Sequence, residues 1–379
     1  MNFRATVIRG RACGLVAVVM AVAVACGGGY GGSDYNGNNM TPVPTVPVAS
    51  ASKFAATALV ADVAGAAAHV DANLVNAWGV AFNPNGFVWV VNNGSNTSTL
   101  YDGNGVPQTL VVGIPAAASG AAHPTGIVFN SSQDFKVSQN GVTGASAFIF
   151  VSEAGTVSGW SPAVNRTSSI TVVDGGANGP VYKGLAIGKV GASNYLYAAD
   201  FRNGNIDVFD ANFAKATLAG NFRDPNLPTG YAPFNIQAIG DRLYVAYARR
   251  AAGAVDETKG AGFGVVAVYD MAGNYVKELT AGGVLNAPWG LAVAPANLGT
   301  FSNAILVGNF GDGKINAFDA SSGAWIGPLS KTDGTPIVID GLWGMAFGNG
   351  LNAQPATTLF FAAGPGDEAH GQYGRIDMQ

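Results

Sequence analysis

The chain is short of charge and of the residues that build helices. Only 11% of its 379 residues are Asp, Glu, Lys or Arg, which is under half of the share of about 25% that is usual in soluble proteins. Glu and Lys, two strong helix formers, are scarce, whereas Gly is abundant with 54 residues. The net charge is −4, and no cluster of Lys or Arg is interleaved with aromatic residues, so nucleic acid is not an expected partner. This composition predicts an all-β protein without long helices.

The sequence also lacks the motifs of common catalytic nucleophiles. It contains no G-x-S-x-G elbow, no H-E-x-x-H, no G-x-x-x-x-G-K-[ST] and no C-x-x-C. Serine, cysteine and helical zinc hydrolases are therefore not supported. An enzyme with this sequence would have to use metal-bound water or acid/base pairs.

The two cysteines, Cys13 and Cys26, both lie near the N-terminus. Three arginines precede the apolar run 15–25, which is typical of an export signal and short for a membrane span. The residues A-V-A-C-G around Cys26 are similar to a bacterial lipobox, and the alternative is ordinary cleavage after residue 25. We predict a signal peptide over 1–25 and an extracytoplasmic protein. It is either a lipoprotein anchored through Cys26, in the periplasm or at the cell surface, or a secreted protein.

Residues 26–52 follow the signal with a different composition. They are rich in Gly and Asn, and then in Pro alternating with Thr and Val. Such a segment cannot bury a core, so we expect a disordered linker between the lipid-anchor cysteine and a folded part over 53–379.

The remaining sequence repeats one pattern of short apolar runs. Its clearest copy, 286–329, contains N-A-P-W-G-L-A-V-A-P, A-I-L-V-G-N-F-G-D-G-K-I-N-A-F-D-A and W-I-G-P-L. These runs are bounded by Gly, Asn, Asp or Pro, which indicates four strands. The pattern recurs over 73–114 and, more loosely, from four later starting points near His123, Val181, Ala232 and Asp340. Six copies at a period of about 40 to 50 residues predict a six-bladed β-propeller of four-stranded blades.

The last copy has only three strands before the chain stops, whereas the third copy is expected to have a fourth strand over 215–220. The run F-A-A-T-A-L-V-A-D-V at about 54–63 resembles the outer strands of the other blades. We expect this N-terminal strand to complete the last blade and to close the ring, because closure removes two exposed strand edges.

Two sets of loops should converge on one end of the propeller, which we call the top face. They are the loops before each innermost strand and the loops between second and third strands. All three histidines fall there, together with amides and carboxylates. The candidate ligand or metal site consists of His69, Asn76, His123, Glu153, Asp200, Asn235, Asn309, Asp367, Glu368 and His370. A divalent cation such as Ca²⁺ is the expected cofactor of a metal site, and the alternative for the histidines is a hydrogen-bonded loop position.

Two insertions on the top face are dense in charge. They are G-P-G-D-E-A-H-G at 364–371 and R-R-A-A-G-A-V-D-E-T-K-G at 249–260. The first suits a metal or an acid/base pair and the second a mobile lid, and a solvated loop is the alternative for both.

Glycines and tryptophans recur at the start of the innermost strands. The glycines (Gly79, Gly126, Gly184, Gly290 and Gly344) indicate backbone crowding at the axis. The tryptophans (Trp78, Trp289 and Trp343) either line a carbohydrate or aromatic binding surface or pack between blades.

Several longer phrases carry a family resemblance over residues 54–379. They include N-L-V-N-A-W-G-V-A-F, A-P-W-G-L-A, L-W-G-M-A-F-G-N-G and F-F-A-A-G-P-G-D-E-A-H-G-Q-Y-G-R-I. The chain resembles an uncharacterised family of exported bacterial proteins, which is similar to NHL-type six-bladed propellers and carries no agreed activity. More distantly it is similar to gluconolactonase-like propellers. That similarity implies a divalent metal in the central channel, and the nearest equivalents of its ligands are Glu153, Asp200, Asn235 and Asn309.

Two classes of function remain open at this point. One is a binding or scaffold module that presents its top face to a glycan, a peptide or a partner protein. The other is a metal-dependent, lactonase-like hydrolase or lyase with its site at the top of the central channel.

Overall fold

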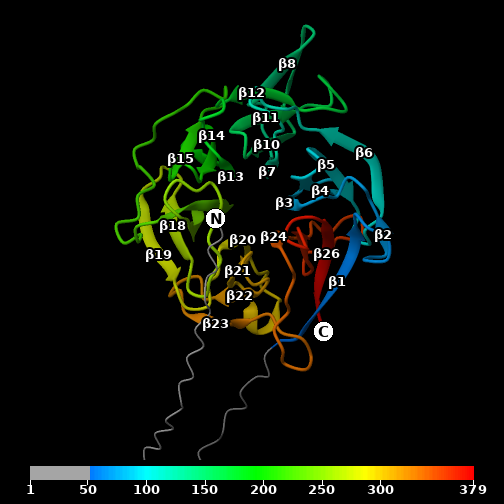
Figure 1. The fold of residues 1–379 in the computed structure, drawn as a ribbon, viewed down its shortest axis with the longest axis vertical. Helices are drawn as coiled ribbons and strands as arrows, with labels where there is room; N and C mark the ends of the chain where they lie inside the picture. The colour runs from blue at the N-terminus through cyan, green and yellow to red at the C-terminus, as the bar shows by residue number, and fades with distance from the viewer. Residues whose placement is uncertain (1–51) are drawn as a thin grey trace, which may run out of the picture. The chain divides into compact units, whose positions relative to one another are not determined.

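The computed structural model describes residues 52–379, which form a ring of six antiparallel sheets (Figure 1). The predicted signal peptide, the Cys26 anchor and the linker up to residue 51 lie outside the described residues. Within 52–379 the sole helical element is the 3₁₀ turn Gly299–Phe301. No helix of this part is long and apolar enough to cross a membrane. The prediction of an all-β, six-bladed propeller is confirmed.

The blades follow one another along the chain, each with its first strand at the axis. Blade one contains β3 (Ala77–Phe82), β4 (Val88–Asn92), β5 (Thr97–Tyr101) and β6 (Pro107–Gly113). Blade two contains β7 (Pro124–Phe129), β10 (Phe148–Ser152), β11 (Thr156–Trp160) and β12 (Ile170–Asp174). Blade three contains β13 (Tyr182–Val190), β14 (Ser193–Asp200) and β15 (Asn205–Phe209). Blade four contains β16 (Tyr231–Ile239), β17 (Arg242–Arg249), β18 (Val265–Asp270) and β19 (Tyr275–Ala281). Blade five contains β20 (Pro288–Val293), β21 (Ile305–Asn309), β22 (Ile315–Phe318) and β23 (Trp325–Pro328).

Blade six is built from both ends of the folded part, as expected. It contains β24 (Leu342–Phe347), β25 (Leu359–Ala363) and β26 (Gln372–Met378), followed at the rim by β1 (Phe54–Ala61) and the short β2 (His69–Val70). Strand β1 pairs antiparallel with β26, from Phe54 opposite Met378 to Ala61 opposite Gln372. The ring is therefore closed by hydrogen bonds between the N-terminal and C-terminal strands.

Blade three has no fourth strand, which corrects the prediction for 215–220. Lys215 forms one bridge with Phe209, after which the chain leaves the sheet. The N–H groups of Gly220 and Phe222 instead donate to the carbonyls of Ala272 and Gly273 in blade four. The backbone of this segment is therefore satisfied by the neighbouring blade and not by β15.

Blade two carries a hairpin that the sequence pattern did not predict. Strands β8 (Lys136–Gln139) and β9 (Val142–Ala145) pair around Asn140-Gly141 and project from the rim of the ring (Figure 1). Both turn residues have positive φ, 51° and 79°, which is the geometry that favours Asn-Gly in tight hairpins.

The core is divided among the contacts between neighbouring blades. Six clusters of buried apolar side chains each join one pair of neighbouring blades, and a seventh lies at the axis. The second strand of a blade is covered on both faces, which explains uninterrupted apolar runs such as F-I-F-V-S in β10 and L-F-F-A-A in β25.

The innermost strands approach one another so closely that five of them carry glycine at the same position. A Cβ on any of these residues would lie between 2.1 and 2.8 Å from an atom of the next blade. The residues are Gly79, Gly126, Gly184, Gly290 and Gly344. Blade four has Asn235 at this position, and its Nδ2 donates to the Trp289 carbonyl of blade five at 2.8 Å. The interpretation of these glycines as points of backbone crowding is confirmed.

The substitution Gly344→Ala tests this crowding at the point where blade six meets blade one. Its Cβ would lie 2.3 Å from the carbonyl oxygen of Trp78, which belongs to the backbone and cannot rotate away. We expect the free energy of unfolding in urea to fall by at least about 2 kcal/mol. The control Gly113→Ala places a Cβ at an ordinary 3.6 Å from the Thr167 carbonyl and should change stability by less than about 0.5 kcal/mol. Equal unfolding midpoints for the two variants would contradict the crowding.

Candidate functional site

The residues just before the axial glycines and Asn235 fill the top of the central channel. We call these six buried side chains the axial plug: Trp78, Thr125, Lys183, Phe234, Trp289 and Trp343. The ring of Trp343 stacks on that of Trp78 with centroids 3.5 Å apart, and Trp289 meets both edge-on at 5.8 and 5.9 Å. The tryptophans therefore pack against one another at the axis, not between blades, and they present no open stacking surface.

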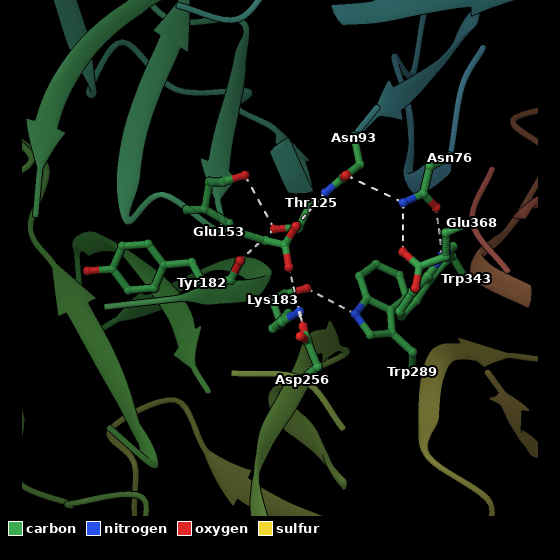
Figure 2. A network of polar contacts seen from close by, with 11 residues as sticks. Asn76, Asn93, Thr125, Glu153, Tyr182, Lys183, Asp256, Trp289, Trp343 and Glu368 are labelled. Atoms are coloured by element: carbon green, nitrogen blue, oxygen red, sulfur yellow. Dashed lines mark hydrogen bonds and ion pairs between the residues drawn. The ribbon is translucent and has the colours of Figure 1, made fainter. Parts of the chain in front are cut away.

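One position of the axial plug is a cation. Lys183 in β13 is 2% exposed, and its Nζ lies 2.5 Å from Glu153 Oε1 and 3.1 Å from Asp256 Oδ1 (Figure 2). Burial alone would lower the pKa of Lys183, but the nearby charges, Glu153 first, reverse the effect and raise that pKa above its ordinary value. Lys183 is therefore an ammonium ion at neutral pH and is not available as a nucleophile or a base.

Glu153 is held from its other side by a chain of amides. Its Oε2 accepts a hydrogen bond from Asn93 Nδ2 at 2.9 Å. Asn76 Nδ2 donates to Asn93 Oδ1 at 3.4 Å and to Glu368 Oε2 at 2.7 Å (Figure 2). Loops of blades one, two and six are thereby connected around the ammonium ion of Lys183.

Two of the three indoles of the axial plug hydrogen-bond to residues of this network, whereas Trp78 Nε1 is buried without a partner among the described residues. Trp343 Nε1 donates to Asn76 Oδ1 at 3.2 Å, and Trp289 Nε1 donates to the carbonyl of Lys183 at 2.9 Å (Figure 2). The apolar packing of the plug and the polar network above it are therefore one connected unit.

Two insertions bring further carboxylates to the centre. The segment between β17 and β18 contributes Asp256 and Glu257, and the segment between β25 and β26 contributes Glu368. Burial raises the pKa of Glu257, and the charge of Lys183 opposes that rise. Burial also raises the pKa of Glu368, while the hydrogen bond from Asn76 opposes it and the charge of Glu153 adds to it. The insertions are thus not simply solvated loops, because Asp256 of one pairs with the buried ammonium ion and Glu368 of the other accepts a hydrogen bond from Asn76.

The structure brings together three of the residues predicted for the site, namely Asn76, Glu153 and Glu368. Three others support local structure. Asp200 accepts hydrogen bonds from the backbone of Val181 and from Asn203. Asn309 Nδ2 donates to the Val284 carbonyl and to Asp312. Asn235 holds the axial position in blade four and borders a void of about 20 Å³ beneath Trp289.

The histidines do not converge. His69 is half-buried in β2 at the rim, and His123 is exposed, with its backbone carbonyl accepting the N–H of Glu153. His370 is also exposed, and its Nδ1 lies 3.0 Å from Asp62 Oδ2. Asp367 is exposed and lies 3.6 Å from the ammonium of Lys259.

The metal site implied by the similarity to gluconolactonase-like propellers does not fit these residues. Within 52–379 no group of three or more His, Cys, Asp or Glu is arranged to hold a metal ion. Glu153 is paired with the ammonium of Lys183. Asp200 is engaged by Asn203, and Asn309 uses its Nδ2 in a bond to Asp312, while no second ligand group of the described residues converges on its Oδ1. The positive charge at the top of the channel is therefore supplied by the chain itself.

The central residues absent from the predicted site are Lys183, Asn93, Asp256 and Glu257. A signal for Lys183 was present, because it precedes Gly184 just as Trp78, Trp289 and Trp343 precede their axial glycines. A cation at a position otherwise held by buried tryptophan requires a buried counter-ion. Asp256 and Glu257 lie in a long insertion, and nothing in their local sequence indicates where that insertion docks.

A cavity of about 290 Å³ opens beside this centre, between blades five and six. We call it the top-face pocket. Its polar lining consists of Asp312, Asp340, Asp367 and Lys259, and Phe310 and Val338 supply apolar surface. The Nζ of Lys259 lies 4.2 Å from the ring centroid of Phe310, and the other face of that ring stacks on Trp343 at 3.8 Å. The pocket therefore shares an aromatic wall with the axial plug.

Comparison with known proteins finds relatives in sequence and solved structures with a similar fold. No protein-family model matches the chain. Two uncharacterized proteins of Acanthamoeba polyphaga mimivirus, R648 and L690, are each 37% identical to it. The match to R648 covers 76% of this chain and 72% of R648, and the match to L690 covers 74% and 75%.

Among solved structures, a glucose dehydrogenase aligns with a TM-score of 0.50 and 13% identity over 85% of this chain and 98% of its own. A streptogramin B lyase aligns with a TM-score of 0.46 and 13% identity over 86% and 97%. At 13% identity the likeness to the glucose dehydrogenase shows a shared fold alone. The TM-score of the streptogramin B lyase is too low to support a conclusion.

The variant Lys183→Met tests the buried ion pair. It leaves the partly buried carboxylate of Glu153 without its cation, so the free energy of unfolding should fall by about 3 kcal/mol. Adding Glu153→Gln should restore part of that loss, because it removes one of the uncompensated charges. The control Lys215→Met breaks an exposed pair with Asp207 and should cost less than about 1 kcal/mol. Urea unfolding that shows equal losses for the two lysine variants would contradict the role given to Lys183.

Proposed function

The chain belongs to the same family as the uncharacterized mimivirus proteins R648 and L690, and from its site we propose that it is an exported binding module that holds a glycan in the top-face pocket. The observation that carries the proposal is the lining of this pocket. Asp312, Asp340 and Asp367 supply acceptors and Lys259 supplies a donor, while Phe310 and Val338 are apolar. Sugars present hydroxyl groups at their edges and C–H groups on their faces. The aspartates and Lys259 suit the hydroxyl groups, and the 58% exposed Val338 offers apolar surface to a C–H face, whereas Phe310 is only 3% exposed.

The size of the pocket favours a small ligand or the end of a longer one. Its volume of about 290 Å³ is at the lower end of the range of about 300 to 1,000 Å³ found for ligand sites. One sugar unit is therefore the portion we expect to be enclosed, with the rest of a glycan extending from the open face.

The axial plug and its ion pair support binding in a different way. They connect the loops that form one wall of the pocket, because Phe310 stacks directly on Trp343. A wall that is already ordered loses little conformational entropy when a ligand arrives, which favours affinity. The permanently charged Lys183 has a positioning role in this proposal and no catalytic one.

Export and anchoring complete the proposal. The signal over 1–25 and the lipobox-like sequence at Cys26 support a lipid anchor, and the linker over 26–52 would separate the propeller from the membrane surface. The metal-dependent hydrolase or lyase lacks comparable support, because the described residues form no metal-ligand group.

A glycan array with the purified protein tests the ligand class. We expect saturable binding of at least one glycan, and Asp340→Ala should weaken it by about tenfold because a hydrogen bond to a charged acceptor is lost. The control Asp241→Ala removes an 84% exposed aspartate from the loop between β16 and β17, at the opposite end of the propeller, and should leave affinity unchanged. No glycan binding, or equal affinity of the two variants, would overturn the glycan proposal, and selective capture of peptides would favour a peptide ligand instead.

Cell fractionation tests the anchor. The wild-type protein should appear in the membrane fraction, and its mature N-terminal peptide should carry a lipid on Cys26 when it is analysed by mass spectrometry. Cys26→Ser should move the protein to the soluble extracytoplasmic fraction, because the protein then lacks the acyl chains that would insert into the membrane. An unmodified Cys26 in wild-type protein would show that the chain is secreted without an anchor.

A further inference from the structure

The missing outer strand of blade three leaves a second cavity, which the glycan proposal does not use. It has a volume of about 340 Å³ and lies between blades three and four, near the top ends of their strands. We call it the blade-three pocket. Its lining includes Asn205 and Ile206 of β15, Tyr247 of β17, and Phe222 and Asp224 of the loop between β15 and β16.

Asp224 is the unusual residue of this pocket. It is only 6% exposed, and its Oδ1 accepts the backbone N–H of Asn226 at 2.8 Å. Its Oδ2 is buried and has no hydrogen-bond partner, and Asp224 takes part in no ion pair within residues 52–379. A buried carboxylate oxygen without a partner is costly, so its retention at the wall of a cavity points to a ligand that supplies the missing donor.

The surrounding charges favour a positively charged ligand. Glu278 lies close enough that the charge of Asp224 adds to the burial that raises the Glu278 pKa. Arg223 lines the same pocket but forms no ion pair in the described part of the chain, and Arg250 donates to the carbonyls of Phe201 and Arg202. The carboxyl groups of Asp224 and Glu278 are therefore not paired with a cation of the described residues.

The remaining walls suit an alkyl chain and a further hydrogen bond. Phe222 and Tyr247 supply aromatic surface, and the Tyr247 and Tyr269 hydroxyls share a hydrogen bond of 2.7 Å. On the outer edge of β15 the Val208 carbonyl is occupied by the N–H of Ala216. The backbone N–H and C=O groups of Ile206, two residues away, point to the same outer edge of β15. They have no backbone hydrogen-bond partner at that edge among the described residues.

We propose that the blade-three pocket binds an organic ammonium ion, with the ammonium group at Asp224 Oδ2 and the attached carbon chain against Phe222 and Tyr247. Carboxylates and aromatic faces both attract such cations. The ligand is either a free primary amine or the lysine side chain of an extended peptide that follows the open edge of β15. Both sources share the chemistry that the pocket recognises.

Calorimetric titration of the full protein with n-butylammonium chloride and with an N-acetylated, C-amidated lysine tests the site. We expect saturable binding of both probes, and n-butanol, a neutral analogue of similar shape, should bind at least about tenfold more weakly. Asp224→Asn keeps the hydrogen bond from Asn226 and removes the charge, so it should weaken ammonium binding by about tenfold or more. The control Asp241→Asn should bind the probes like the wild type.

Several outcomes would overturn the proposal. They are the absence of saturable ammonium binding, equal affinity for n-butanol, and unchanged affinity in Asp224→Asn. Absence of binding together with higher thermal stability of Asp224→Asn would assign the pocket to buried water alone. If Asp224→Asn fails to fold, Phe222→Ala replaces it as the test variant and should weaken binding several-fold, because it removes aromatic surface from the pocket. Tyr247→Phe, which keeps the ring, is its control and should weaken binding less than twofold.

A short peptide distinguishes the two sources once ammonium binding is established. An extended hexapeptide with a central lysine should bind at least about tenfold more tightly than the blocked lysine if backbone pairing with β15 contributes. Equal affinities support the same pocket with a free amine as its ligand.

Discussion

The structure depends on how closely the six innermost strands approach the axis. At one position of the innermost strand the next blade leaves no room for a Cβ in five of the blades, which have glycine there. Blade four has Asn235 at the corresponding position, and this residue hydrogen-bonds across the gap to blade five. This contact fixes the direction of the preceding side chain, because successive residues of a strand point to opposite sides. Six side chains are thereby directed into the channel, and their chemical nature decides what the top of the propeller does.

Three of these side chains are tryptophans and one is a lysine, which divides the centre into an apolar part and a charged part. The indole N–H groups of Trp289 and Trp343 join the two parts by hydrogen bonds. A chain that is poor in charge places a cation and four carboxyl groups around this point. Because Lys183 is buried, its charge holds the loop that supplies Glu153, since moving Glu153 away would leave the ammonium ion with only the exposed Asp256 as its partner. The top face is thus held in one arrangement by electrostatics as well as by packing.

Much of the fold could be predicted because propeller strands leave periodic signals. Short apolar runs between turn residues located the strands of the first five blades, apart from the fourth strand of blade three. The strand near residue 54 was needed to complete the sixth blade. The predicted fourth strand of blade three was wrong because the partner of its backbone lies in another blade, which no local pattern reveals. The site was predicted only in part for a similar reason. Asn76 and Glu153 lie next to strand ends whose positions are periodic, and Glu368 lies in a short insertion that is dense in charge. Asp256 and Glu257 lie in a longer insertion, and their contact with Lys183 depends on a residue of another blade.

The pairing of β1 with β26 also sets the order of events during folding. Its partners, such as Phe54 and Met378, are separated by more than three hundred residues, so the ring stays open until both strands are available to pair. Individual hairpins and contacts between neighbouring blades can form before that pairing, but the axial crowding is complete only when all six blades are in place. Long-range pairing of this kind slows folding, and for the same reason the native ring opens only when its seam is lost. The location of that seam therefore makes the ordered top face depend on a contact between two segments that lie far apart in the sequence.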